Sequence, residues 1–299
     1  MSEAFTNAGA HRPPASIVIL STRGSHAVLE ILDALPGRGS SDVEILVVAR
    51  QPLPPDLRPR FPAVRTLELP GNTSLPTLRA RGLREARGDV VAILGEHLRP
   101  GPGWLAAVLR VDGGSAAGGP VVAGTLRGAA AWAFFLLEYA AFIPPASEPP
   151  RLAGSNCVYG RRALDQLPPL PEVAFDEELH ASLRRAGAPF VHEPGLLMRC
   201  EKSISVRHFL AQRFHCGRVS AAARARPWPG WKRMAFAALT PLLPLVLLGR
   251  LFITLARKRR HGGAVVRAFP LIAVALVCGA WGEAVGCLAG PGRSGERAE

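Results

Sequence analysis

Several short segments of almost unbroken apolar residues constrain the fold more than any other feature of this sequence. They lie at residues 15–20, 43–49 and 90–94, and a more polar one follows the second of them at 64–69. A strand whose successive side chains are nearly all apolar is buried on both faces, as in parallel sheets that helices cover. Helical patterns separate these strands. The sequence therefore predicts an α/β fold with a mostly parallel sheet and helices on both faces.

The segments between and after these strands carry helix and loop signals. Gly-Asn-Thr-Ser at 71–74 supplies capping side chains before a helix that tolerates Pro76 in its first turn. Residues 50–62 contain five prolines, which predicts a loop. The remaining patterns predict a helix at 26–35, a strand at 120–126, a helix at 132–142, a short strand and a helix start within 152–164, and a helix after 175.

The basic charge is concentrated in the last third of the chain. The formal net charge is +13, and residues 201–299 carry 16 Lys and Arg against 4 Asp and Glu. These residues flank two apolar runs, at 234–249 and 268–282, with Arg-Lys-Arg-Arg-His between them at 257–261. Nucleic-acid-binding arms do not alternate with apolar runs of this length. The pattern therefore indicates a membrane surface as partner, and no nucleic acid.

The membrane topology of the two apolar runs stays open at this point. Each run has 15 or 16 residues before a charge, whereas a straight spanning helix needs about 20. Pro241 and Pro244 interrupt the first run, and basic residues on both of its sides conflict with the positive-inside rule for a simple span. Two spans and a kinked, re-entrant or interfacial hairpin both agree with the sequence.

Neither the first residues nor the cysteines indicate export. The opening residues MSEAFTNAGAHRPP contain no apolar core of a signal peptide. The five cysteines include no CxxC pair, which favours a reducing compartment. We expect the first domain to face the cytoplasm.

Polar side chains follow the strand at 90–94 directly. Glu96 and His97 stand at its carboxyl end, before the turn Pro-Gly-Pro-Gly that leads to Trp104, a predicted core residue. Ligands of parallel α/β sheets bind outside the carboxyl ends of strands, so these two side chains are candidates for a binding site. The alternative is that Glu96 caps a turn and His97 is an ordinary loop histidine.

Two later groups of polar residues are further candidates. Asp176, Glu177 and Glu178 open a predicted helix, where the helix dipole alone would also favour acids. Arg213 lies on an apolar helical stripe and must find an anion or another acceptor there. The stripe consists of Val206, Phe209, Leu210, Phe214 and Gly217. A basic amphipathic helix lying on lipid head groups explains this second pattern as well.

Seven segments of the chain resemble, in the same order, those of the family-2 glycosyltransferases, whose GT-A fold is a nucleotide-sugar-binding α/β sheet. They are ASIVILSTRG, VEILVVA, LRARGLREARGDVVAIL, RPGPGWL, AGSNCVYGRRAL, FDEELHASLRRAG and FLAQRFHCGR. The resemblance implies a GT-A domain at 14–200, a basic amphipathic interface region at 201–233 and two membrane-embedded helices at 234–290. Residues 1–13 and 291–299 are predicted to be disordered.

The resemblance assigns Glu96 and His97 to metal and diphosphate binding. In the family an Asp-x-Asp element at this strand end holds a divalent cation, Mg²⁺ or Mn²⁺, on the donor diphosphate. The matching positions here are Gly95, Glu96 and His97, a set that suits Mn²⁺ better than Mg²⁺. A subset of these enzymes resembles this chain more closely here, because it has Glu-Asp-His at the same place.

The resemblance also names a catalytic base and donor contacts. Inverting transfer needs a carboxylate that takes the proton of the acceptor hydroxyl. Ungapped spacing to Gly187 puts Asp176 in this role, whereas Glu-containing variants point to Glu177. The donor contacts it implies are Arg79 and, as a looser form of a Gln-x-x-Arg-Trp element, Gln212 and Arg213. Ser21-Thr22-Arg23 and Val48-Ala49-Arg50 replace the acids that often contact the nucleoside, so the donor base is not identified.

The sequence thus predicts an inverting glycosyltransferase at the membrane. It would move a sugar from a nucleotide-sugar donor to a lipid-linked or cell-surface glycan acceptor. The alternative is a catalytically silent GT-A domain that serves as a membrane scaffold or subunit, because the Asp-x-Asp pair and both nucleotide-site acids are absent.

The predicted topology is testable by labelling. A single cysteine engineered near residue 40 should not react with an impermeant maleimide added to intact cells, and should react after the cells are permeabilised. Ready labelling of intact cells would contradict a cytoplasmic catalytic domain.

Overall fold

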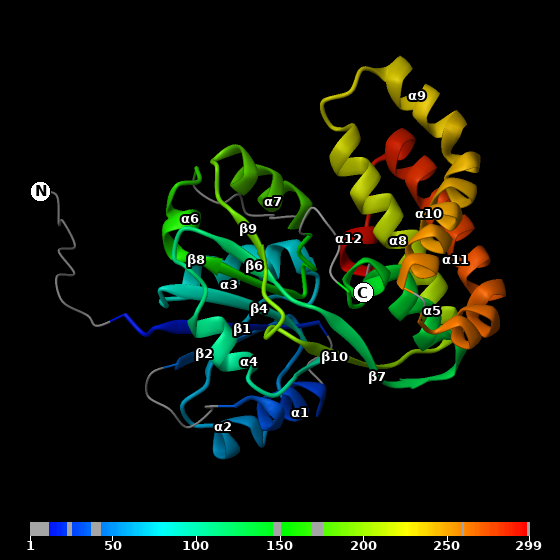
Figure 1. Cartoon of the computed structure of the whole chain (residues 1–299). Coiled ribbons are helices and arrows are strands. Elements are labelled where there is room, and N and C mark those ends of the chain that lie inside the picture. The colour runs from blue at the N-terminus through cyan, green and yellow to red at the C-terminus, as the bar shows by residue number, and fades with distance from the viewer. Residues whose placement is uncertain are drawn as a thin grey trace, which may run out of the picture.

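The computed structural model describes most of the chain (Figure 1). The described residues are 12–22, 26–36, 43–145, 151–168, 176–258 and 260–297. The predicted disordered N-terminus, 1–13, lies almost wholly outside them. The predicted disordered tail contains a short helix, α12 (Ser294–Arg297), whose Ser294 Oγ lies 2.9 Å from His215 Nδ1.

A seven-stranded sheet forms the centre of the first part of the molecule, in the order β3-β2-β1-β4-β8-β6-β9. Its parallel core confirms the strands read from the sequence: β1 (Ala15–Ser21), β2 (Val43–Ala49), β3 (Arg65–Glu68) and β4 (Val90–Gly95). The later strands are β6 (Ala116–Gly118), β8 (Asn156–Gly160) and β9 (Phe190–His192). Strand β8 runs antiparallel to β4 and β6, so the sheet is mixed but mostly parallel.

Both faces of the sheet are buried, which explains the unbroken apolar strands. Along β1, Ile17 and Ile19 pack into one core and Val18 and Leu20 into the other. The first core includes residues of α1 (His26–Ala34), α4 (Trp104–Leu109) and α5 (Gly128–Tyr139), and Trp104 is fully buried there as predicted. The second includes α3 (Leu75–Glu85), α6 (Arg161–Asp165) and α7 (Asp176–Arg185).

Local signals set most of the helix boundaries. Ser74 caps α3 as predicted, accepting a hydrogen bond from Thr77 N at 3.4 Å, and Pro76 lies in the first turn. Two expectations need correction. The proline-rich segment 50–62 is not all loop but contains the short helix α2 (Leu57–Arg60), because Pro59 is tolerated within a first turn. The helix expected at 132–142 begins at Gly128 and ends at Tyr139, followed by a 3₁₀ turn, η1 (Ala140–Phe142).

A second, three-stranded sheet leads from the α/β part to the C-terminal helices. Its order is β5-β10-β7, with β5 (Leu98–Pro100), β7 (Val121–Arg127) and β10 (Met198–Ser203). Strand β10 pairs parallel with β7 and antiparallel with β5, which follows Glu96 and His97 directly. The candidate residues after β4 therefore lie where the two sheets meet.

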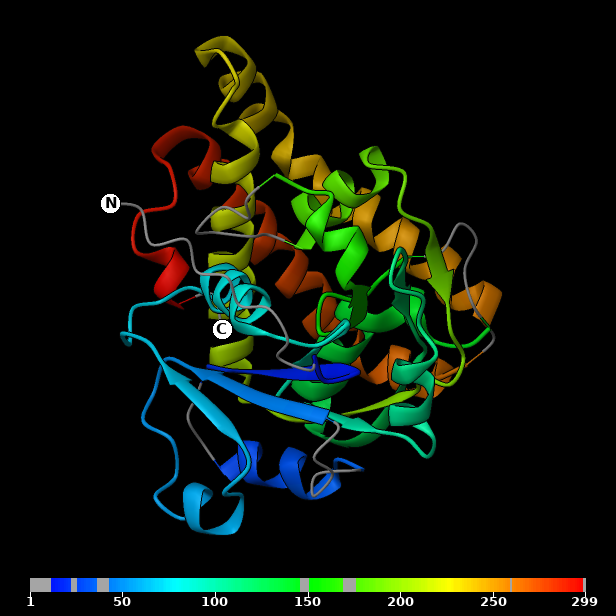
Figure 2. The same ribbon diagram turned by 90° about the vertical axis from the view of Figure 1, so that its left-hand side faces the viewer.

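The C-terminal helices form a layer of their own beside the α/β part (Figures 1 and 2). Its members are α8 (Val206–Ala225), α9 (Gly230–Leu239), η2 (Thr240–Leu242), α10 (Leu243–Lys258) and α11 (Gly262–Ala289). Helix α5 packs against α11 although it precedes this layer by many residues. Glycines bring α8 and α11 into backbone contact: a Cβ at Gly282 would lie 2.1 Å from the Phe214 carbonyl oxygen.

The helical layer exposes most of the large apolar side chains on the described surface. Of eighteen such side chains, fifteen lie between Trp231 and Leu288. The continuous segment Gly230–Lys258 and helix α11 are long and apolar enough to cross a membrane, by length and composition. The turn η2, which contains Pro241, interrupts the first segment where the prolines predicted a kink.

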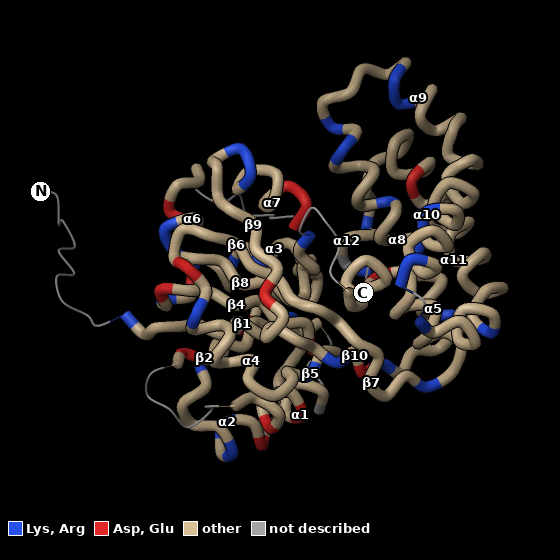
Figure 3. The backbone as a smooth tube through the Cα atoms, viewed as in Figure 1, with Lys and Arg blue, Asp and Glu red and all other residues tan. Residues whose placement is uncertain are grey.

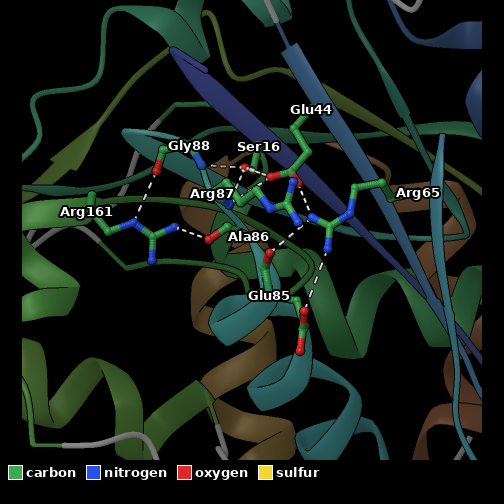
Figure 4. A network of polar contacts seen from close by, with 8 residues as sticks. All are labelled: Ser16, Glu44, Arg65, Glu85, Ala86, Arg87, Gly88 and Arg161. Carbon is green, nitrogen blue, oxygen red and sulfur yellow. Dashed lines mark hydrogen bonds and ion pairs between the residues drawn. The ribbon is translucent and has the colours of Figure 1, made fainter. Parts of the chain in front are cut away.

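A polar network ties the amino ends of the strands together, at the opposite end of β1 from Ser21 (Figure 4). Glu44 on β2 accepts hydrogen bonds from Ser16 Oγ, from Arg65 and, at 2.8 Å, from Arg87 N. Ser16 Oγ also accepts from Gly88 N at 2.7 Å. Burial alone would raise the pKa of Glu44, but the hydrogen bonds from Ser16, Arg87 and Arg65 outweigh it and hold this pKa below its usual value.

Substituting Glu44→Gln should therefore destabilise the fold by about 2 kcal/mol at neutral pH, because several donors lose a charged acceptor. A depressed pKa contributes stability that is complete above the ordinary glutamate pKa of about 4.3 and is lost as the pH falls through the lower folded-state value. The free energy of unfolding, measured with urea, should therefore differ less between wild type and Glu44→Gln at a pH below about 4.3 than at neutral pH. An equal difference at pH 7 and pH 3.5 would contradict this account.

Candidate functional site

Glu96 is fixed at the carboxyl ends of two neighbouring parallel strands. It follows β4 directly and is only 9% exposed. Its carboxylate accepts hydrogen bonds from Ser21 Oγ at 3.0 Å and from Thr22 Oγ1 at 3.2 Å, both at the end of β1. A buried carboxylate is stable only where such donors compensate its lost hydration. Glu96 thus lies at the edge of the sheet where ligands of α/β proteins bind.

His97 turns toward helix α5. Its Nε2 lies 2.6 Å from the Tyr139 hydroxyl, which in turn lies 2.7 Å from Ser155 Oγ. The imidazole also packs edge-on against Phe134, with ring centroids 5.4 Å apart. Burial raises the pKa of Tyr139 well above its usual value, so its hydroxyl stays protonated and bridges His97 and Ser155. His97 therefore anchors the loop after β4 to α5.

The donor set around Glu96 does not make a complete metal site. Among the residues that the structure describes, no group of three or more His, Cys, Asp and Glu side chains could hold an ion. Because His97 Nε2 is engaged with Tyr139, only Nδ1 of this ring could join the Glu96 carboxylate on an ion. A single carboxylate binds Mg²⁺ or Mn²⁺ weakly without oxygen ligands from a bound diphosphate. We therefore derive no reaction step through a metal.

A polar pocket of about 330 Å³ opens beside Glu96 and His97. Strand β5, strand β7, strand β10 and the start of α1 contribute the rest of its lining. Arg99 on β5 lines the pocket and forms two ion pairs there, with Glu30 at 2.6 Å and with Glu201 at 3.7 Å. The pocket thus carries both signs of charge, as a site for a polar ligand would.

Arg79 and Asp176 meet on the other face of the sheet. Arg79 on α3 is 4% exposed, and its Nη1 lies 3.7 Å from Asp176 Oδ1 at the first residue of α7. Asp176 also packs onto Gly154, where an added Cβ would lie 2.0 Å from Asp176 Oδ2. The structure therefore brings together a predicted donor contact and a predicted base. Glu177, the other predicted base, is exposed.

Behind Asp176 lies a buried chain of polar groups. His180 Nε2, one turn along α7, lies 2.7 Å from the Tyr159 hydroxyl, and Cys157 Sγ lies 3.0 Å from the same hydroxyl. Burial lowers the pKa of His180 to about 4 and outweighs the nearby Asp176 carboxylate, which would raise it. His180 is therefore neutral at physiological pH. Its place behind Asp176 agrees with a structural role.

Gln212 and Arg213 lie on α8, where α8 faces α5. Arg213 Nη1 lies 3.7 Å from Glu138 Oε2. Within the described part of the chain, the buried atoms Gln212 Oε1 and Arg213 Nε have no hydrogen-bond partner. Buried polar atoms of this kind are normally satisfied, so both side chains retain capacity to bind a ligand.

Glu138 is a residue of this region that sequence reasoning missed. It is the one charged residue of α5, and besides Arg213 the charges that act on it come from Asp176, Lys202 and Glu177. Lys202 Nζ lies 4.5 Å over the Phe134 ring and lines the pocket at Glu96. A lone acid in an otherwise apolar helix was the available signal in the sequence.

Arginine occupies the place where the resemblance would put a nucleoside-binding acid. Arg50 follows β2 and is 7% exposed. It donates hydrogen bonds to the backbone carbonyls of Thr22 at 3.2 Å and Thr73 at 3.1 Å. Arg50 thus joins the ends of β1 and β2 to the turn before α3.

Comparisons with known proteins bear on the fold alone. No family model and no curated protein matches the sequence. Among solved structures, the mannosyltransferase PcManGT from Pyrobaculum calidifontis, in complex with GDP-Man and Mn²⁺, is similar with a TM-score of 0.52 and 17% identity. The similarity covers 90% of this chain and 86% of that chain. It therefore extends well beyond the central sheet.

Two other solved structures are similar over less of the chain. Glucosyl-3-phosphoglycerate synthase from Mycobacterium tuberculosis has a TM-score of 0.43 and 17% identity over 67% of this chain and 76% of that chain. TarS 1-349 from S. aureus has a TM-score of 0.45 and 13% identity over 68% and 63%. Since these scores are below 0.5, the fold assignment rests on PcManGT. The chain has the GT-A fold, with a mixed, mostly parallel sheet and two long apolar C-terminal helices.

The neutral His180 makes a testable contribution to stability. Its folded-state pKa lies below the ordinary 6.5, so wild type loses stability as the pH falls from 6.5 toward 4, while the unfolded chain takes up a proton. Between pH 7 and pH 5, wild type should lose about 2 kcal/mol relative to His180→Gln. Thermal unfolding at both pH values measures this difference. His208→Gln, at an exposed position of α8, serves as the control for replacing a histidine. A His180 difference independent of pH would contradict the buried neutral state.

Proposed function

We propose that the protein is a membrane-attached, inverting glycosyltransferase that uses a nucleotide-sugar donor. The observation that carries this proposal is the position of Glu96. In a GT-A fold, its carboxylate is held at the carboxyl ends of β1 and β4, beside a polar pocket of about 330 Å³. This is the sheet edge where ligands of α/β folds bind. The similar mannosyltransferase PcManGT was solved with GDP-Man and Mn²⁺, which makes a sugar nucleotide the natural ligand class to test.

The polar residues that the resemblance names have the chemistry that such a reaction needs. Arg79, Gln212 and Arg213 would bind the donor diphosphate and compensate the charge that develops on it as the sugar leaves. Glu96 would hold the diphosphate through a divalent cation, Mn²⁺ or Mg²⁺, when one is bound. A carboxylate takes the proton of the acceptor hydroxyl. The sequence names Asp176 and Glu177 for this role, and Asp176 is the one that pairs with Arg79.

The helical layer supports a membrane location. Helices α9, α10 and α11 expose large apolar side chains such as Trp231, Leu245 and Trp281, each at least 66% exposed. Figure 3 shows mainly Lys and Arg among the charged residues of this layer. Apolar surface flanked by basic residues binds anionic bilayers. A lipid-linked or cell-surface glycan acceptor would reach the enzyme at this surface, with the catalytic domain on the cytoplasmic side.

A silent membrane scaffold is the second candidate. Two observations favour it: the described residues form no group of three or more possible metal ligands, and Arg50 occupies a position where the resemblance would place an acid. A scaffold would keep the fold and the membrane surface and would bind no nucleotide.

Donor turnover distinguishes the two candidates. Purified protein in detergent with Mn²⁺ should release nucleoside diphosphate from at least one of a panel of UDP- and GDP-sugars. Glu96→Ala and Asp176→Ala should lower this rate at least tenfold, as expected when a charged group at a reaction centre is removed. Asp33→Asn, in an exposed ion pair with Arg60, is the control and should keep the rate. No turnover and no nucleotide binding across a broad panel would favour the scaffold.

A further inference from the structure

Helix α11 is held against the α/β part at both of its ends. At its start, the His261 ring packs on Trp132 and Phe135 of α5, with ring centroids 5.4 and 5.9 Å apart. Phe135 belongs to the first core of the central sheet. After its end, the chain folds back: a Cβ at Gly295 in α12 would lie 3.9 Å from the Cβ of Ser74, which caps α3. Figure 1 shows α12 between the α/β part and α8.

These contacts do not agree with a helix that crosses a bilayer. Helix α11 has 28 residues and is about 42 Å long, whereas the hydrocarbon core of a bilayer is about 30 Å thick. The ends of a spanning helix lie on opposite sides of that core. Because both ends of α11 contact the same α/β part, spanning would place polar surface of that part at the depth of the lipid chains. Helix α11 therefore runs along the α/β part.

The apolar segment before α11 also ends on the α/β part. Lys258, the last residue of α10, donates a hydrogen bond to the Pro145 carbonyl. Leu251 and Leu255 of α10 belong to the first core. Both apolar segments thus meet at a turn that is anchored on the α/β part.

Helix α8 covers one side of α11 and brings arginines with it. A Cβ at Gly286 would lie 2.2 Å from the Arg218 carbonyl oxygen, so the two backbones touch. Arg218 Nε donates to the Gly290 carbonyl at 2.8 Å, and Arg224 forms an ion pair with Glu283. Charged groups at the depth of the lipid chains are costly. This side of the helical layer therefore stays outside the hydrocarbon.

The other side of α11 exposes a single apolar stripe along most of the helix. Val266, Val277 and Trp281 are 74%, 58% and 66% exposed. The complete stripe also includes Phe269, Val274 and Leu288. At these spacings all six side chains lie on one helical face. The Phe252 ring of α10 lies 5.8 Å from the Phe269 ring, so the exposed apolar faces of the two helices adjoin.

The charges beside this apolar surface are basic. Arg250, Arg257, Arg260 and Arg267 are exposed on α10, on α11 and in the turn between them. Glu283 is the one acid between residues 206 and 289. Apolar side chains edged by arginine suit the boundary between anionic head groups and lipid chains. A second copy of this chain would instead bring like charges together.

We propose that the helical layer sits in one leaflet of an anionic bilayer and that neither apolar segment crosses the membrane. This inference rests on the membrane attachment of the proposed function and not on sugar transfer. The apolar stripe of α11 and the adjoining face of α10 enter the leaflet. The α/β part, α8, the turn before α11 and the tail after it all remain on the cytoplasmic side.

Three single cysteines test this topology in cells. Arg226→Cys precedes the first apolar segment, Arg260→Cys lies between the two, and Arg293→Cys follows α11; all three positions are exposed. An impermeant maleimide added to intact cells should label none of them above wild type, whose five native cysteines give the background. After permeabilisation each variant should gain about one label per chain. Labelling of any position from outside places a segment across the membrane and overturns the proposal. A position that also resists labelling after permeabilisation lies in lipid and contradicts it too.

Vesicle flotation tests the surface itself. Full-length protein is diluted from detergent onto phosphatidylcholine vesicles with or without phosphatidylglycerol. Val277→Ser combined with Trp281→Ser should weaken binding to the anionic vesicles at least tenfold, because two large apolar side chains lose their burial in lipid. Leu109→Ser is the control, since Leu109 is 46% exposed on α4 of the α/β part, and it should bind as wild type does. Vesicles without phosphatidylglycerol should bind at least tenfold more weakly.

The opposing results separate this inference from the proposed function. Equal binding by the double variant and wild type, or equal binding to neutral and anionic vesicles, overturns the assignment of this surface to an anionic leaflet. Vesicle binding together with labelling from outside overturns only the one-leaflet topology. Wild-type protein that floats with neither kind of vesicle refutes the membrane attachment in the proposed function, and this inference falls with it.

Discussion

A sheet buried on both faces leaves room for charged side chains only at its two ends. At each end of this sheet, hydrogen bonds compensate a carboxylate. Glu44 satisfies its charge with Ser16, Arg65 and the backbone of Arg87, and so locks the amino ends of β1 and β2 to the turn before β4. Glu96 accepts hydrogen bonds from the hydroxyls of Ser21 and Thr22, which hold it beside a pocket. The first end stabilises the fold, and the second carries the donor site that we propose.

Helix α5 joins the helical layer to the loop that carries Glu96 and His97. Helix α5 leaves the α/β part and packs with α8 and α11, which contact each other through glycines. Through Tyr139 it fixes His97, and through Glu138 it faces Arg213. One helix thus connects the loop after β4 to the apolar surface that we assign to the membrane. In the proposed function, an acceptor held in a bilayer would meet the donor side at this junction.

The sequence revealed what depends on local patterns and missed what depends on contacts between distant segments. The strands β1, β2 and β4 followed from apolar runs, and the caps and prolines of α3 from residues within one turn. The position of Glu96 directly after β4 followed from the sequence, because strand ends are local features. The partner of His97 was not foreseeable, because Tyr139 reaches it only after α5 has folded back. Glu138 was missed for the same reason, because its ion-pair partner Arg213 comes from another helix far along the chain.

The most direct test of the central claim is a calorimetric titration of the purified protein with sugar nucleotides. If the Glu96 edge is a donor site, at least one of UDP-Glc and GDP-Man should bind saturably, at one site per chain, in the presence of Mn²⁺. Glu96→Ala should weaken that binding at least tenfold, since it removes the carboxylate at the centre of the edge. Absence of saturable binding by any nucleoside-diphosphate sugar, or equal affinity in wild type and Glu96→Ala, would contradict the account.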